Sequence, residues 1–161
     1  MTGLCVIDMQ PYYKASHPAL QNVIREIRCA KAEGMPIILV KMLNPNKDDP
    51  DPVSRWETEI FEEIELELET YDKVMRAGKR NCDGSGAVLR ALRRHGYHLA
   101  NLRVCGVETD ACVEATVCSL SRQMRTTIIE VIMDACNHNN KSKDRGETFK
   151  EMRDLDNVRL S

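Results

Sequence analysis

Short apolar runs alternate with segments of helical spacing along this chain of 161 residues. Apolar runs of about four to eight residues bounded by turn signals are typical of buried strands, and apolar positions three or four apart are typical of amphipathic helices. These patterns predict strands at residues 3–8, 36–41, 73–75, 102–105, 127–133 and 158–160, and helices at residues 19–33, 55–69, 83–95, 110–123 and 144–153. Such alternation predicts a parallel sheet covered by helices on both faces, a three-layer α/β/α sandwich.

Composition and charge limit the class of partner. The net charge of -2 and an aromatic content of 4% give no reason to expect nucleic acid or a membrane surface as a partner. The first residues run straight into a predicted strand without a secretory signal, so we expect a cytoplasmic protein. In that setting the seven scattered cysteines should be reduced thiols. Five of them lie on apolar runs and are expected in the core: Cys5, Cys29, Cys105, Cys118 and Cys136.

The segment GVETDACV, residues 106–113, is the strongest functional signal. It follows the apolar run at residues 102–105 and predicts a strand that stops at a glycine, turns, and starts a helix near Asp110. Cys112 then lies in the first helical turn, where unpaired N–H groups and the helix dipole favour a thiolate. A thiol at the carboxyl end of a strand is a candidate nucleophile.

An acid and a cation are expected beside that thiol. Ligands gather at the carboxyl ends of the strands in an open parallel sheet. Asp8 closes the first predicted strand, and Lys79 follows the third. The carboxylate can accept the thiol proton, and an ammonium group stabilises the thiolate. Lys73 and Arg76 are alternative cations; Lys79 is preferred because it lies between the strand end and the next helix start.

The backbone of the turn adds a further function. N–H groups that precede Cys112 can donate hydrogen bonds to a developing oxyanion. An acid, a cation, a thiol and such donors favour acyl transfer to water from an amide or a related carbon–nitrogen bond. The sequence therefore predicts a small-molecule hydrolase.

Three segments resemble the isochorismatase-like cysteine hydrolases, a superfamily that includes nicotinamidases and N-carbamoylsarcosine amidases. CVIDMQPYY resembles the opening Asp-x-Gln-x-x-aromatic pattern, with Asp8, Gln10 and Tyr13 in the matching places. GVETDACVEAT resembles the nucleophile segment, with its matching residues at Gly106, Thr109, Cys112, Val113 and Thr116. VIMDAC resembles the strand that ends in Asp134 and Ala135.

The resemblance implies one isochorismatase-like hydrolase domain over residues 1–161, with a mostly parallel, Rossmann-like sheet of five to six strands in the order 3-2-1-4-5-6. It implies Asp8 as general base, Lys79 as the cation and Cys112 as nucleophile. A cis peptide bond is expected between Val107 and Glu108. The substrate and oxyanion region is expected at Gln10, Tyr13, Val107, Glu108, Thr109 and Ala111. No cofactor is implied, and a homo-oligomer, a dimer or tetramer, is expected.

One departure from the family concerns metal. Nicotinamidases carry an Asp-x-His…His cluster after the second strand, whereas the segment KMLNPNKDDPDP, residues 41–52, has no histidine. We therefore expect no catalytic zinc and regard nicotinamide as a disfavoured substrate. His95 and His98 have metal-compatible spacing but no partner in the sequence, so we interpret them as surface or helix-end residues.

Three functional hypotheses follow. The first is cleavage of an amide-like bond through a thioester intermediate. The second, within the same fold, is isochorismate-type vinyl ether hydrolysis, which relies less on the cysteine. The third is a catalytically silent member that acts as a binding or regulatory subunit. The presence of all three polar candidates favours catalysis.

Overall fold

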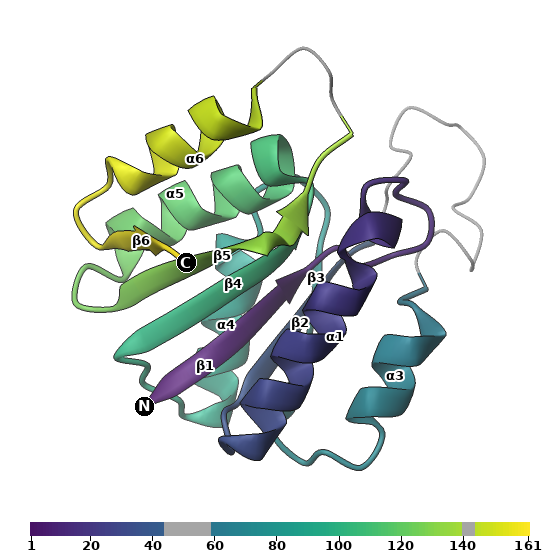
Figure 1. Cartoon of the computed structure of the whole chain (residues 1–161). Helices are drawn as coiled ribbons and strands as arrows, with labels where there is room; N and C mark the ends of the chain where they lie inside the picture. The colour runs from purple at the N-terminus through teal and green to yellow at the C-terminus, as the bar shows by residue number, and fades with distance from the viewer. Residues whose placement is uncertain (44–58, 140–143) are drawn as a thin grey trace.

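Parallel strands in the order β3-β2-β1-β4-β5-β6 form the central sheet in the computed structural model of this chain (Figure 1). The structure describes residues 1–43, 59–139 and 144–161. The six strands found there are β1 (Thr2–Ile7), β2 (Ile37–Met42), β3 (Val74–Lys79), β4 (Asn101–Val107), β5 (Ile128–Asn137) and β6 (Val158–Leu160). The predicted strand order is confirmed.

Helices cover both faces of this sheet (Figure 1). One face carries α1 (Ser16–Ala32) and α3 (Glu62–Leu68), and the other carries α4 (Ser85–His95), α5 (Glu114–Gln123) and α6 (Arg145–Arg153). A short π-helical turn, η1 (Thr109–Val113), precedes α5. The three-layer α/β/α sandwich is therefore confirmed.

The core forms between these layers. Strands covered on both faces are apolar almost throughout, and Leu4–Ile7 of β1 is fully buried. On α1 the buried side includes Ala19, Val23 and Ile27, each four residues after the last and so on one face of the helix. Cys29 is exposed, which corrects the expectation that it belongs to the core. It follows Ile27 by two positions, and at about 3.6 residues per turn this places it on the opposite side of α1.

The other cysteines follow the sequence interpretation more closely. Cys5, Cys105 and Cys136 are buried, and Cys118 is half-buried. All seven are free thiols in the described structure. His95 and His98 are exposed, at the end of α4 and shortly after it, as expected.

Several element boundaries differ from prediction, among them the start of the acidic helix and the end of the third strand. The acidic helix expected over residues 55–69 begins at Glu62, and its expected part before residue 59 lies outside the described residues. Phe61 is extended, with φ -51° and ψ 132°, and its N–H donates to Met9 O at 3.3 Å. The third strand is longer than expected because β2 pairs with it along its whole length. Lys79 is consequently the last residue of β3 rather than a residue that follows it.

Residues 44–52, most of the segment after the second strand that contains no histidine, lie outside the described residues. Within the part of the chain that the structure describes, no helix has the length and apolar character needed to cross a membrane.

Candidate active site

Asp8 stands where β1 ends, beside the point at which the strand order reverses from β1 to β4. Its φ of 50° is left-handed, a conformation that aspartate adopts more readily than most residues. Its N–H donates to Val40 O at 2.9 Å, and its carbonyl accepts from Gln10 N at 2.8 Å. These contacts fix the backbone of Asp8, and its side chain is buried.

Lys79 reaches the same point from β3. Its Nζ lies 2.6 Å from Oδ2 of Asp8, and the two side chains are only 2% and 1% exposed. Nζ also donates to the carbonyl oxygens of Asn81 at 3.1 Å and Cys82 at 3.2 Å. Neither oxygen of Asp8 receives a well-aligned hydrogen bond, so the contact is chiefly an ion pair.

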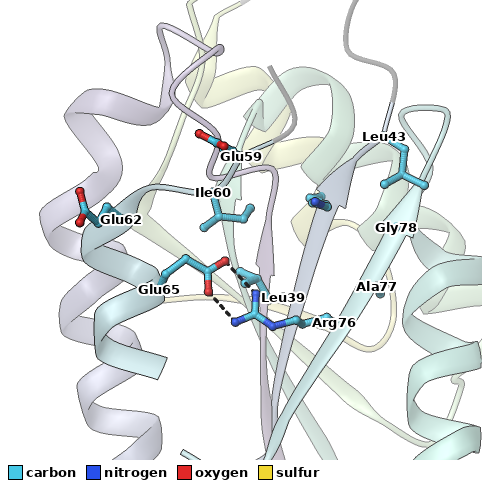
Figure 2. Close-up of a pocket in the computed structure, with 10 residues that line it drawn as sticks. Leu39, Leu43, Glu59, Ile60, Glu62, Glu65, Arg76, Ala77 and Gly78 are labelled. Atoms are coloured by element: carbon cyan, nitrogen blue, oxygen red, sulfur yellow. Dashed lines mark hydrogen bonds and ion pairs between the residues drawn. The ribbon is translucent and has the colours of Figure 1, made fainter. Parts of the chain in front are cut away.

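The two alternative cations are occupied elsewhere. Lys73 is exposed and donates to Gly34 O at 2.9 Å. Arg76 makes a bidentate ion pair with Glu65, at 2.8 and 2.5 Å (Figure 2). The structure therefore places Lys79, and neither alternative, beside Asp8.

Cys112 is brought to this pair by the exit from β4. Gly106 has φ 120°, and a Cβ there would lie 2.1 Å from Ile7 O, so only glycine permits the close approach of β4 to β1. The peptide bond between Val107 and Glu108 is cis, as the resemblance implies. The η1 turn that follows carries Cys112, which is 7% exposed, beside β4.

The three side chains lie together. The sulfur of Cys112 lies beside both groups, so that Asp8 raises and Lys79 lowers the pKa of the thiol. The carboxyl end of the sheet thus assembles an acid, a cation and a thiol from three separate segments of the chain.

The electrostatics of this cluster correct one expectation. Burial first, and the nearby Asp8 carboxylate second, raise the pKa of Cys112, and Lys79 opposes them only in part. These groups therefore favour the neutral thiol of Cys112, in the opposite direction to the thiolate that its place near a helix start favours. Burial outweighs the favourable helix end because the sulfur shares a closed space with a carboxylate.

The acid and the cation are also perturbed. Burial raises the pKa of Asp8 above its ordinary value, and the adjacent Lys79 offsets this only partly. For Lys79, burial lowers the pKa, but Asp8 and Cys112 together raise it by more, so the net shift is upward. The site holds a permanent cation next to a carboxylate that takes up a proton more readily than an ordinary aspartate.

The residues expected around the substrate have different surroundings. Gln10 is buried, and its amide donates to Met42 O at 3.1 Å and accepts from Met42 N at 2.7 Å, which fastens the chain after β1 to the end of β2. Tyr13 is half-buried, and its pKa is raised by burial and by the neighbouring Asp8 and Cys112. It therefore lies against the cluster.

The turn before the thiol contains the other expected residues. Val107 is buried, Glu108 and Ala111 are half-buried, and Thr109 is fully buried with no hydrogen-bond partner for Oγ1. The Ala111 N–H donates to Glu108 O at 3.2 Å, so this donor is already engaged.

The residues present do not fit a zinc site of the nicotinamidase type. No group of three histidine, cysteine or carboxylate residues suited to a metal occurs among residues 1–43, 59–139 and 144–161. The Asp8 carboxylate faces an ammonium group, and the sequence holds no histidine between His17 and His95. Zinc favours imidazole and thiolate ligands, and the donor set here does not supply them.

One groove of the described structure lies away from the three polar residues. It has a volume of about 720 Å³ and lies between α3 and the outer strand β3 (Figure 2). The Arg76–Glu65 ion pair crosses it, and Ile60 and Leu39 line its wall. Asp8, Lys79 and Cys112 are not among its lining residues, so its size does not identify it as the reaction site.

The carbonyl groups of Asn81 and Cys82 are functional contacts that sequence reasoning missed. Every residue has a carbonyl, so no side-chain pattern distinguishes the two that bind Lys79. The turn sequence Asp83-Gly84-Ser85 was the available signal, because it places a tight loop directly after the lysine.

Comparison with known proteins gives the family context. Residues 2–158 match the family model described as an isochorismatase domain. No curated protein matches the sequence significantly.

Solved structures share the fold at low sequence identity. A pyrazinamidase/nicotinamidase from Streptococcus mutans superposes with a TM-score of 0.81 at 16% identity, with 100% of each chain covered. A pyrazinamidase of Pyrococcus horikoshii in complex with zinc gives 0.75 at 19%, with 99% of this chain and 98% of that chain covered. The ycaC gene product of Escherichia coli, described as an octameric hydrolase of unknown specificity, gives 0.71 at 17%, with 99% and 74% covered.

Proposed function

This chain belongs to the isochorismatase family, and from that premise we propose that it is a hydrolase that cleaves an amide-like carbon–nitrogen bond of a small molecule through a thioester on Cys112. The observation that carries the proposal is the contact of Asp8, Lys79 and Cys112 at the carboxyl end of the sheet. Each supplies a separate requirement of acyl transfer: a proton acceptor, a fixed positive charge and a nucleophile.

Acylation begins from the neutral thiol. As the Cys112 sulfur attacks the substrate carbonyl carbon, its proton passes to the Asp8 carboxylate, and the carbonyl π electrons move onto oxygen. The raised pKa of Asp8 suits this role, because a stronger base accepts the proton with less cost. Generating the thiolate only during attack avoids holding two negative charges beside each other in a buried site.

The tetrahedral intermediate carries its charge on the former carbonyl oxygen. Backbone N–H groups of the turn from Val107 to Cys112 are the proposed donors to this oxyanion, apart from the Ala111 N–H, which is engaged. Loss of one such donor costs on the order of 3 kcal/mol in known enzymes. Lys79 stabilises the cluster as a cation and keeps its protons throughout.

Collapse of the intermediate expels the amine, which takes the proton from Asp8 and leaves a thioester. Water then gives a proton to the Asp8 carboxylate and attacks the thioester carbon. The carbon–sulfur bond breaks, and the departing sulfur recovers its proton from Asp8. The cycle returns every group to its starting protonation state.

Small carboxamides and N-carbamoyl compounds are the proposed substrate class. Some structural neighbours are described as nicotinamidases or pyrazinamidases, and so act on small carboxamides. The described residues of this chain, however, do not fit the zinc site expected of nicotinamidases. Nicotinamide therefore remains the disfavoured member of the class. A single hydrolase domain over residues 1–161, assembled as a dimer or tetramer, completes the proposal, and light scattering of the purified chain measures that assembly.

The test compares wild type with Cys112→Ala and, as a matched control, Cys29→Ala. Ammonia release from a panel of small carboxamides and N-carbamoyl compounds, nicotinamide included, gives the rate. Cys112→Ala should lose at least about a thousandfold in kcat/KM on any compound turned over, and Cys29→Ala should not change it. Intact mass after a rapid acid quench should show one acyl group on wild type.

Two results would contradict the proposal. The first is undiminished turnover by Cys112→Ala, measured on the panel and also with isochorismate. It favours vinyl ether hydrolysis, because that reaction relies less on the cysteine. Tight binding of a compound without turnover and without an acyl adduct favours a catalytically silent member.

A further inference from the structure

A short loop after β3, residues 80–84, encloses the side chain of Lys79. Two carbonyl groups of this loop accept from Nζ, those of Asn81 at 3.1 Å and Cys82 at 3.2 Å. A Cβ on Gly84 would lie 3.1 Å from Lys79 Cδ, so the loop also packs closely along the aliphatic stem. The position of Lys79 therefore depends on the conformation of this loop.

The ammonium group lies among three oxygen atoms. Nζ is 2.6 Å from Oδ2 of Asp8 and donates to the two loop carbonyl oxygens. Because two of these three neighbours belong to the loop, a change in the direction of one carbonyl alters where Nζ can sit. A shift of Nζ changes its distance from the Cys112 sulfur as well.

One hydroxyl holds the loop in place. Oγ1 of Thr116, in α5, accepts from Gly84 N at 2.8 Å and donates to Cys82 O at 3.4 Å. Thr116 is fully buried, so water does not compete for these bonds. The Cys82 carbonyl thus accepts from both Thr116 and Lys79.

The same stretch of chain carries the nucleophile. Thr116 follows Cys112 by four residues, about one helical turn, so thiol and hydroxyl belong to one rigid segment. A second contact from α5, Ser119 Oγ to Oδ2 of Asp83 at 2.6 Å, holds the loop without touching either carbonyl that binds Lys79.

We propose that Thr116 is a positioning residue that sets the place of the Lys79 ammonium relative to Asp8 and Cys112 by orienting the Cys82 carbonyl. This inference rests on the proposed role of Lys79 beside the thiol. In this role the buried Thr116 hydroxyl fixes the position of the loop that binds Lys79 relative to the segment that carries Cys112.

The experiment uses the alkylation of Cys112, which requires no substrate. Iodoacetamide is applied from pH 7 to 10, and peptide mass spectrometry gives the rate at Cys112 separately from the other cysteines. The variants are Thr116→Val, which keeps the shape and loses the hydroxyl, Thr116→Ser, which restores the hydroxyl, and the control Ser119→Ala. Thr116→Ala serves as a second hydroxyl-free variant if valine disturbs folding, which thermal unfolding reports.

Thr116→Val should shift the alkylation profile to higher pH and slow the reaction by about three- to tenfold at a fixed pH below the midpoint, since one pKa unit changes the thiolate fraction about tenfold. The reason is that Lys79 lowers the pKa of Cys112, and a displaced ammonium lowers it less. Thr116→Ser should return the profile to that of wild type, and Ser119→Ala should not move it.

Three results would overturn the inference: an unshifted profile in the hydroxyl-free variants, an equal shift in Ser119→Ala, or no recovery in Thr116→Ser. Lys79→Met separates this from the proposed function. If Lys79→Met shifts the profile and Thr116→Val does not, only the role of Thr116 fails. If Lys79→Met leaves the profile unchanged, the cation has no influence on the thiol and the proposed triad fails as well.

Discussion

The Nζ atom of Lys79 lies 2.6 Å from Oδ2 of Asp8, and almost no surface of either side chain reaches solvent. A pair buried to this degree is costly to assemble and costly to break, because each charge has lost its hydration. Cys112 lies beside both partners, where the proposed reaction needs a fixed charge.

Removal of the cation should destabilise the fold. Lys79→Met leaves the Asp8 carboxylate buried without a partner, and we expect a loss of about 3–5 kcal/mol in the free energy of unfolding at pH 8. The loss should be smaller at pH 5, because unpaired Asp8 takes up a proton. Urea unfolding at both pH values measures this loss of stability.

Asp134→Asn is the control for Lys79→Met. It breaks a contact of equal length, 2.6 Å to Arg25, between two half-exposed side chains, and should cost less than about 1 kcal/mol. Equal losses in the two variants would contradict a buried, uncompensated charge.

Stability should fall as pH rises above 9. Burial raises the pKa of Cys5 and of Cys136 from 9.0 to about 12. Between these values the unfolded chain has released protons that the folded chain still binds, so each residue lowers the free energy of unfolding by about 1.4 kcal/mol per pH unit. Urea unfolding with a phosphine reductant from pH 8 to 10.5 measures the slope. Cys136→Ala should flatten it, and Cys29→Ala, at an exposed position, should not; a slope that Cys136→Ala leaves unchanged would count against this account.

Gly106 should tolerate no side chain. Alanine there would set Cβ 2.1 Å from Ile7 O at a φ of 120°, so β1 and β4 would have to separate beside the cluster. We expect Gly106→Ala to lose several kcal/mol or to fail to fold. Gly96→Ala is matched to it, because Gly96 also has positive φ, 70°, but nothing within 4 Å of its Cβ position. It should cost about 1 kcal/mol. Similar melting temperatures for the two variants would refute the steric explanation.

Gln10 should contribute to stability through Met42. Gln10→Leu leaves a buried N–H and a buried carbonyl without their partner, and we expect a loss of about 2–4 kcal/mol. Gln123→Leu is the comparison, because Gln123 is exposed and makes one bond of 3.3 Å to Ser85. It should change stability by less than about 0.5 kcal/mol. Thermal unfolding of both variants measures the two losses of stability. If Gln10→Leu leaves stability unchanged, the backbone groups of Met42 have found another partner.

Much of the fold could be predicted because its signals are local. The apolar runs of β1 and β2 predict buried strands. The spacing of Leu20, Val23, Ile24 and Ile27 predicts the buried face of α1, where all four are buried. The ends of elements depend on partners elsewhere in the chain. β3 extends to Lys79 because β2 pairs with it that far, and a weakly apolar sequence such as RAGK does not reveal such a partner.

In the candidate site, too, the residues with local sequence signals could be predicted, and the contacts between remote segments could not. The motifs that indicate Asp8 and Cys112 lie within single segments. The sequence favours Lys79 over Lys73 and Arg76 only by its place between the strand end and the next helix start. The structure shows the two alternatives bound to Gly34 and Glu65, and it brings Lys79 to Asp8. The carbonyl groups that hold Lys79, and the Thr116 hydroxyl behind them, come from segments more than thirty residues apart.

The sequence by itself determined the α/β architecture and the chemical identity of the acid, the thiol and the turn that presents it, since periodicity and motif residues are properties of neighbouring positions. Only the tertiary structure decided which cation meets the acid and that burial beside Asp8 raises the pKa of Cys112. Both depend on burial and on distances between segments remote in the chain. The charge state of a side chain depends on the groups and the water around it. These surroundings form when the sheet brings the ends of its strands together.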